Sequence, residues 1–367
     1  MKQRMVIDTY SRREAIDSRG KWLTEAAGGR GCMKQPSIEW LLDPKDPSIR
    51  FHTLIDLLDR SISDKDVVAT KERIRNYGPV KRIMAGQTRD GYWPPKETCY
   101  RPKWTAAAWP LALLGEMGAP ADHRIKGECE RFFDLHQVGT GAFSCVTKLE
   151  RGKRWDEACL TGNMIRTLIK FGYDDDRRVK KAIDWLPEHQ LEDGGWNCDY
   201  PQRKVKHSSF MSTIEPLWAY SEIPRRKWTR KMKRSIEKGA EFLLMHRVYK
   251  SDNHHWKETY PFFTALHFPM YYFYDVLHGL RVLTKLGYSD DERIRDATHL
   301  LLSKRSPNGT WNLEGDWFRE GDFFYPSGKG RKAPVSMEQI GKPSKWITLN
   351  CYRVLTETGD VVIPQTL

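Results

Sequence analysis

The chain has 367 residues and a mass of 42.9 kDa, and 39% of its residues are apolar and 30% charged. This composition is typical of a globular protein with a substantial core, and no stretch approaches the roughly 18 uninterrupted apolar residues that a membrane-spanning helix needs. The formal net charge of +13 directs attention to three classes of anionic partner: a nucleic acid, an anionic membrane surface or an anionic substrate.

The N-terminal region is polar and carries charges throughout, without the apolar segment of a secretory signal. This pattern predicts a cytoplasmic protein. The seven cysteines are an odd number spread over a long chain, which argues against a disulfide framework and predicts reduced thiols. We expect residues 1–47 to form an irregular extension and residues 48–367 to form one domain.

A turn with constant internal spacing recurs along the chain and indicates a repeat. Its full copies place an aromatic residue six positions after a glutamine, with a glycine between them: Gln87–Gly91–Trp93, Gln137–Gly141–Phe143 and Gln190–Gly194–Trp196. A fourth copy, around Gly309 and Trp311, has Arg305 in place of the glutamine.

The predicted helices begin with Ser48–Asp59 and with a first outer helix at Lys65–Gly86. Apolar helices that follow the turns are expected to form an inner layer: Lys103–Met117, Cys159–Phe171, Ser208–Ser221, Met270–Leu286 and Lys345–Thr356. More polar helices alternate with them as an outer layer: Asp122–Leu135, Arg178–Leu186, Lys231–Met245 and Glu292–Leu302. Repeats that cannot bury a face alone predict an all-α closed ring, an α/α toroid of about five to six helical hairpins.

The segment 315–343 lacks any periodicity and is too long for a plain connection, so we interpret it as a lid or a plug of the ring. The basic run Arg225–Arg234 precedes an amphipathic stretch, and no nucleic-acid-binding motif accompanies it. We interpret this run as a solvated helix face and do not expect a nucleic-acid partner.

The Gln-x-x-x-Gly-x-aromatic turns resemble the QW motifs of the squalene cyclase and protein prenyltransferase β-subunit superfamily, over residues 65–357. The stretches Cys159–Asn163 and Gly194–Cys198 are similar to an uncharacterised bacterial and archaeal family of prenyltransferase/squalene oxidase repeat proteins. The resemblance implies a terpenoid-cyclase-like ring and an enzyme that acts on a hydrophobic, isoprenoid-like small molecule in the central cavity. The alternative is a non-catalytic toroid that binds a lipid or a protein partner.

The acids that start terpenoid cyclisation in this superfamily are absent from the sequence. No Asp-x-Asp-Asp motif occurs, and the contiguous acids Asp174–Asp176 are explained by capping of an outer helix. The segment Asp290–Ile294 does not match the Asp-Asp-x-x-Asp pattern of a magnesium–diphosphate site either. The reaction therefore does not follow from the resemblance.

Protein prenyltransferases hold a catalytic zinc through an Asp-x-Cys at the start of one inner helix and a histidine at the start of the next. Glu157, Cys159 and His207 occupy the corresponding positions here, so the resemblance implies a three-ligand zinc site. Cys198 and Cys145 could reach the same end of the ring, and with Cys159 and His207 they would make a closed structural site. Without zinc, these cysteines are small buried residues, and Cys159 remains the candidate nucleophile at a helix N-terminus.

Asp275 is the third candidate for catalysis, beside Cys159 and His207. It lies in the apolar run Tyr271–His278, where a buried acid is costly without a task or a partner. We therefore expect Asp275 to act as a general acid or base.

Aromatic residues of the inner helices are candidates for substrate binding, because ring faces stabilise positive charge and suit apolar ligands. We select Trp104, Tyr271 and Tyr274 on this ground. The predicted first and last inner helices open on Lys103 and on Lys345–Trp346, and these helices would be neighbours in a closed ring. Their side chains are expected to hold an anionic group of the substrate.

Overall fold

The computed structural model describes residues 15–16, 22–23, 36–146, 155–200, 203–251, 255–315 and 337–363. The chain divides into two compact units, Met1–Lys34 and Gln35–Leu367. In the first unit, β1 (Ala15–Ile16) and β2 (Trp22–Leu23) pair antiparallel. Most of the predicted lid, residues 316–336, lies outside the described residues. In the part that is described, no helix is both long and apolar enough to cross a membrane.

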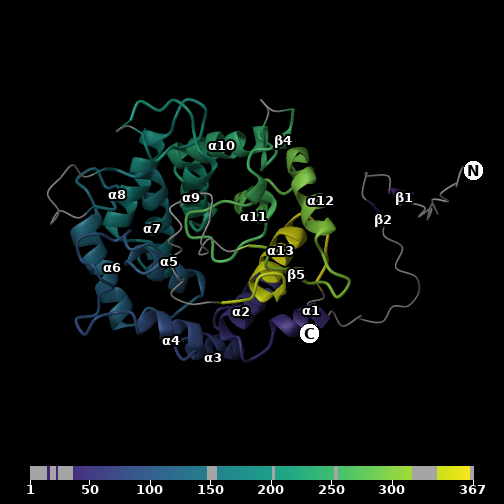
Figure 1. The fold of residues 1–367 in the computed structure, drawn as a ribbon, viewed down its shortest axis with the longest axis horizontal. Coiled ribbons are helices and arrows are strands. Elements are labelled where there is room, and N and C mark those ends of the chain that lie inside the picture. The colour runs from purple at the N-terminus through teal and green to yellow at the C-terminus, as the bar shows by residue number, and fades with distance from the viewer. Residues whose placement is uncertain are drawn as a thin grey trace, which may run out of the picture. The chain divides into compact units, whose positions relative to one another are not determined.

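The second unit is a ring with two layers of helices, as the sequence predicts (Figure 1). The inner layer consists of α2 (Pro47–His52) with its π-helical continuation η1 (Thr53–Leu57), α5 (Ala108–Glu116), α7 (Ala158–Lys170), α9 (Phe210–Ser221), α11 (Val276–Leu286) and α13 (Lys345–Glu357). The outer helices are α1 (Pro36–Leu41), α3 (Lys65–Ile74), α4 (Gly78–Met84), α6 (His123–His136), α8 (Arg177–Trp185), α10 (Arg230–Met245) and α12 (Arg295–Ser303).

Short elements complete the ring. They are the 3-10 helices η2 (Leu186–His189), η3 (Arg225–Lys227), η5 (Pro261–Thr264) and η6 (Glu292–Ile294), and the antiparallel strand pairs β3 (Lys250–Ser251) with β4 (Lys257–Glu258) and β5 (Trp311–Asn312) with β6 (Pro343–Ser344). Each of the last two sheets has two residues per strand, so the domain is all-α in character.

The two layers differ in how much of each helix is buried. Every residue of α5 is buried, because the outer layer covers one side of this helix and the centre of the ring the other. The outer helix α6 instead buries one stripe that includes Ile125, Cys129, Phe132 and Phe133. This spacing of three and four residues is the expected pattern of a helix that faces a core on one side and solvent on the other.

The second and third of the recurring turns each bind one hairpin to the next through their glutamine. In the third turn, the Gln190 amide donates to the carbonyl oxygens of Gly194 (2.6 Å) and of Ser235 in α10 (2.8 Å). Six residues on, the Trp196 indole donates to the carbonyl oxygen of Leu186 (2.9 Å). Gly194 has a φ of 96°, a left-handed conformation that favours glycine. The second turn repeats the glutamine contacts through Gln137, whereas the Gln87 amide of the first turn is buried and has no hydrogen-bond partner among the described residues.

Several predicted helix boundaries were wrong. The helix predicted from Lys103 begins at Ala108, and the one predicted from Met270 begins at Val276. The segments that lead into them are turns, in which Trp104 and Tyr271 have positive φ angles of 71° and 52°. The predicted helix 65–86 is two helices, because a proline at the start of α4 interrupts it.

The ring also closes differently from the prediction. Helix α2 with η1 packs against α13, and the His52 ring bonds to the carbonyl oxygen of Glu116 at the end of α5 (2.9 Å). The inner layer therefore has α2 and η1 between α13 and α5 (Figure 1). The predicted pairing of the first and last inner helices fails for this reason.

Candidate functional site

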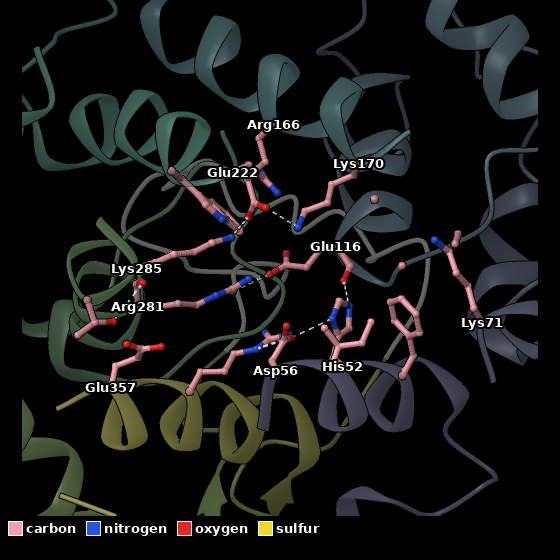
Figure 2. Close-up of a pocket in the computed structure, with 18 residues that line it drawn as sticks. His52, Asp56, Lys71, Glu116, Arg166, Lys170, Glu222, Arg281, Lys285 and Glu357 are labelled. Carbon is pink, nitrogen blue, oxygen red and sulfur yellow. Dashed lines mark hydrogen bonds and ion pairs between the residues drawn. The ribbon is translucent and has the colours of Figure 1, made fainter. Parts of the chain in front are cut away.

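A cavity of about 480 Å³ lies where the inner helices end (Figure 2). Its lining comes from the last turns of α5, α7, α9, α11 and α13, from α2 with η1, and from α3. The lining is highly charged, with the acids Asp56, Glu116, Glu222 and Glu357 and the bases Lys71, Arg166, Lys170, Arg281, Lys285 and Arg353. Phe51, Ile55 and Trp218 add apolar surface. The cavity thus combines an excess of basic groups with an apolar portion.

Glu222, just after the end of α9, lies between two lysines. Its carboxylate contacts the amine of Lys170 from α7 (2.6 Å) and the amine of Lys285 from α11 (2.9 Å). Burial alone would raise the pKa of Glu222, but the two ammonium groups outweigh it and hold the pKa well below its usual value. Desolvation lowers the pKa of Lys285 to about 8, although Glu222 opposes the shift.

A second group of charges joins α5, α11, α13 and η1. The Arg281 guanidinium contacts the Glu116 carboxylate (2.9 Å), and Arg353 Nε donates to Asp56 (3.0 Å). Burial raises the pKa of Asp56, but Arg353 and His52 outweigh burial, so the pKa lies well below its ordinary value. Asp56 also lies 3.3 Å from His52 Nδ1. These contacts order the mouth of the cavity as a network of ionised groups.

The deep part of the cavity contains Arg166, which is 2% exposed. Its guanidinium carbon lies 3.5 Å from the centre of the Trp218 ring, a favourable cation–π contact. The Glu215 carboxylate lies 3.6 Å from Arg166 Nη2, which is longer than a normal hydrogen bond. Arg166 is therefore a positioned cation with a weakly engaged partner.

The predicted zinc ligands do not assemble into a metal site. Cys159 and Cys198 form a disulfide, so neither sulfur is available as a thiolate, and the prediction of reduced thiols is wrong for this pair. His207 is exposed, and the Glu157 carboxylate accepts a hydrogen bond from the Cys145 backbone (2.9 Å). Among the described residues, no three His, Cys, Asp or Glu side chains gather as a metal site. In this arrangement the predicted zinc ligands do not gather around one point, and Cys159 is paired with Cys198 rather than a free thiol.

Asp275 has structural partners that account for its burial. It caps α11 by accepting from the His278 backbone N–H (2.7 Å), and its other oxygen accepts from the His267 N–H (2.8 Å). The residue is 1% exposed and does not line the cavity. Capping and hydrogen bonding therefore satisfy the acid that we expected to take part in catalysis.

We expect Asp275→Ala to lower the free energy of unfolding by about 2–4 kcal/mol, because it removes a helix cap and leaves a buried N–H without an acceptor. Asp122→Ala is the matched control, since Asp122 caps the outer helix α6 at a less buried position, and there we expect about 1 kcal/mol. Urea unfolding of both variants measures the difference. Equal losses in the two variants would contradict the structural role of Asp275.

The aromatic residues predicted to bind substrate instead pack together. Trp104 stacks on Tyr271 with ring centres 4.9 Å apart, and neither lines the cavity. The Lys103 amine lies over the rings of Tyr100 (3.5 Å) and Tyr272 (4.0 Å). This cluster belongs to the segments that lead into α5 and α11, whereas the cavity lies where these helices end.

The remaining predicted substrate residues also have other partners. The Tyr274 hydroxyl donates to the carbonyl oxygen of Val248 (2.6 Å). Lys345 forms ion pairs with Asp43 and Asp46, and Trp346 stacks on a neighbouring phenylalanine ring 4.3 Å away. None of Tyr274, Lys345 and Trp346 lines the cavity. The structure therefore does not bring Lys103 and Lys345 together.

The sequence held a signal for the cavity that motif reasoning missed. Arg166, Glu215 and Arg281 are charged residues inside otherwise apolar inner helices. Charged side chains at such positions must find partners or a polar cavity, because burying them alone is costly. The recurring motifs lie instead in the loops that lead into the helices, away from these positions.

Comparison with known proteins gives a likeness in structure only. No family model matches the chain, and no curated protein matches it. Matching solved structures include ent-copalyl diphosphate synthase from Streptomyces platensis, with 16% identity and a TM-score of 0.43 over 87% of this chain and 51% of that one. This chain thus spans about half the length of that synthase.

Two further matches are enzymes whose activities differ from each other. A family 88 glycosyl hydrolase from Bacteroides vulgatus has 10% identity and a TM-score of 0.48 over 89% of this chain and 93% of that one. A type II terpene cyclase from Scytonema, in complex with geranylgeranyl dihydroxybenzoate, has 12% identity and a TM-score of 0.32 over 89% of this chain and 99% of that one. At these TM-scores, neither a substrate nor a reaction carries over to this chain.

Proposed function

We propose that this protein is an enzyme that binds a small amphiphilic anion in the cavity where its inner helices end. The observation that carries the proposal is the convergence of basic side chains from three inner helices, among them Arg166, Arg281 and Arg353, on one confined space. The volume of about 480 Å³ is within the usual range for a small-molecule site.

The apolar part of the lining makes the ligand amphiphilic. Phe51 and Ile55 from α2 and η1, and Trp218 from α9, offer surface to a hydrocarbon or ring portion of the ligand. The proposed ligand therefore shares an apolar portion with the isoprenoid-like molecule expected from the sequence, and it differs by carrying an anionic group. A molecule without any charge would desolvate the ionic lining without replacing its contacts, which is unfavourable.

Lys285 supports a catalytic rather than a purely binding role. Its pKa of about 8 lets its amine exchange a proton with a bound molecule close to neutral pH, which is the requirement for a general acid or base. The amine contacts Glu222 within the cavity lining.

Hexanesulfonate is a suitable probe, because it carries a short apolar chain and a negative charge that is independent of pH. We expect isothermal titration calorimetry to detect its binding and to detect none for hexyltrimethylammonium, which has the same chain and the opposite charge. Arg281→Gln should weaken hexanesulfonate binding about 10- to 100-fold, as expected for loss of a charge-assisted hydrogen bond.

Arg226→Gln is the control, since it removes the same charge from an exposed position in η3. We expect hexanesulfonate affinity to stay within about twofold of the wild type in this variant. Arg281→Lys keeps a positive charge beside Glu116. Comparing it with Arg281→Gln tests whether the weaker hexanesulfonate binding comes from leaving Glu116 without a positive partner, rather than from losing a group that binds the anion. Equal binding of the two probes, or equal losses in Arg281→Gln and Arg226→Gln, would refute the proposal.

A further inference from the structure

Arg166 at the deep end of the cavity and Glu215 behind it are buried side chains with few hydrogen bonds. Glu215 is 0% exposed, and within the described part of the chain neither of its carboxyl oxygens has a hydrogen-bond partner. Arg166 Nε is likewise buried and has no hydrogen-bond partner among those residues. Buried polar atoms in folded proteins nearly always have partners, so this pair is poised to accept another group.

The packing of two helices places this pair. Gly162 of α7 faces the backbone of α9 so closely that a Cβ there would lie 2.5 Å from the Glu215 carbonyl carbon. Trp218, one turn after Glu215 on α9, supports the Arg166 guanidinium, and the Arg281 guanidinium lies 4.9 Å from the same ring. Arg166 itself lines the cavity, whereas Glu215 lies behind it.

The groups around Glu215 favour its protonated form. Burial raises its pKa to about 8, since Arg166 from α7 lowers it less than desolvation raises it. Glu116 from α5 adds a negative charge that raises it further. On α11, burial and the charges of Arg281 and Arg166 hold the pKa of His278 well below its usual value, so His278 supplies no positive charge.

We propose that Arg166 is the anion receptor at the deep end of the cavity, and that a proton on Glu215 makes this receptor available. When Glu215 is neutral, the full charge of the guanidinium can bind an anionic group of the ligand. When Glu215 is ionised, its carboxylate competes with the ligand for the same guanidinium. This inference rests on the proposed anion-binding function, and it assigns the preference for a negatively charged ligand to Arg166.

The proton balance gives the sign of the pH dependence. Anion binding places a second negative charge beside Glu215, which raises the pKa of its carboxyl group in the complex. A ligand that arrives while Glu215 is ionised therefore takes up one proton from solvent, which forms the O–H bond of the carboxyl group. Affinity is full below pH 8 and falls by up to tenfold for each pH unit above it.

Lys285 must be separated from this effect, because its pKa is also about 8 and its loss of charge would weaken anion binding as well. The experiment therefore uses the Lys285→Arg chain, in which this position stays charged. In that chain we expect the affinity for hexanesulfonate to be about tenfold lower at pH 9 than at pH 7. Adding Glu215→Gln, a neutral replacement of similar size, should make the two affinities equal.

Two further measurements complete the test. Arg166→Gln should weaken binding at pH 7 at least about tenfold. In the Lys285→Arg chain with Glu215 intact, calorimetry at pH 8.5 in buffers of different ionisation enthalpy should report an uptake of more than about half a proton per anion bound. This second measurement does not depend on whether the Glu215→Gln chain folds.

The outcomes distinguish the two proposals. If hexanesulfonate binds but the pH dependence persists after Glu215→Gln, or no proton is taken up, the role of Glu215 is refuted while anion binding stands. If Arg166→Gln binds as tightly as its parent, Arg166 is not the receptor. If hexanesulfonate binds at no pH, the proposed function itself fails.

Discussion

Replacing Trp196 with alanine should lower the free energy of unfolding by about 3–5 kcal/mol. The Trp196 indole is fully buried and donates to the carbonyl oxygen of Leu186 at the end of an outer helix. The backbone of Gly239 in α10 leaves room for the ring, since a Cβ there would lie 2.8 Å from it. Alanine would leave a large cavity where two successive hairpins meet, and it would leave a carbonyl group unpaired.

Chemical denaturation measures this loss, and Trp256→Ala is the control. Trp256 is 46% exposed, so the same substitution should change the free energy of unfolding by less than about 1 kcal/mol. If Trp196→Ala were as mild as Trp256→Ala, the recurring turns would not be what joins the hairpins.

Gly162→Ala should destabilise the protein by at least about 2 kcal/mol, although alanine is ordinarily the better helix former. The added Cβ would meet the backbone of Glu215 and Pro216, both at 2.5 Å. Backbone atoms cannot yield as a flexible side chain can, so α7 and α9 would have to separate. The same separation would disturb the Arg166–Glu215 pair and weaken anion binding.

Gly127→Ala provides the matched control on the outer helix α6. No atom of the described residues lies within 4 Å of the position that its Cβ would take, so the substitution should stabilise the protein by about 0.5–1 kcal/mol through helix propensity. Thermal and urea unfolding of both variants reveal opposite signs if this is correct. A stabilising Gly162→Ala would show that the two helices are not in close contact.

The fold could be predicted because its repeat depends on local geometry. The Gln190 amide bonds to Gly194, which has a left-handed conformation, and the Trp196 indole bonds to Leu186, so these features all lie within about ten residues of one another. A pattern of this kind is visible in the sequence. The start of α11 was misplaced, because apolar residues continue upstream of Asp275 although this residue caps the helix.

The site could not be predicted in the same way, because it depends on contacts between residues far apart in the chain. Arg281 and Glu116 meet across 165 residues, and no local pattern announces their pairing. Sequence reasoning instead placed the site at the helix starts, where Trp104 and Tyr271 stack on each other. The disulfide of Cys159 and Cys198 was missed because an odd cysteine count says nothing about a single pair.

The junction of α13 with the beginning of the ring has a consequence for how the chain folds. Ser37 of α1 and Tyr352 of α13 share a hydrogen bond of 2.7 Å, although they are 315 residues apart in sequence. Arg353 bonds to Asp56 over a similar separation. Contacts between successive hairpins, such as that of Gln190 with Ser235, join segments much closer in sequence and cost less chain entropy. Closing this seam carries a larger loop-closure cost, so we expect it to form late in the assembly of the ring.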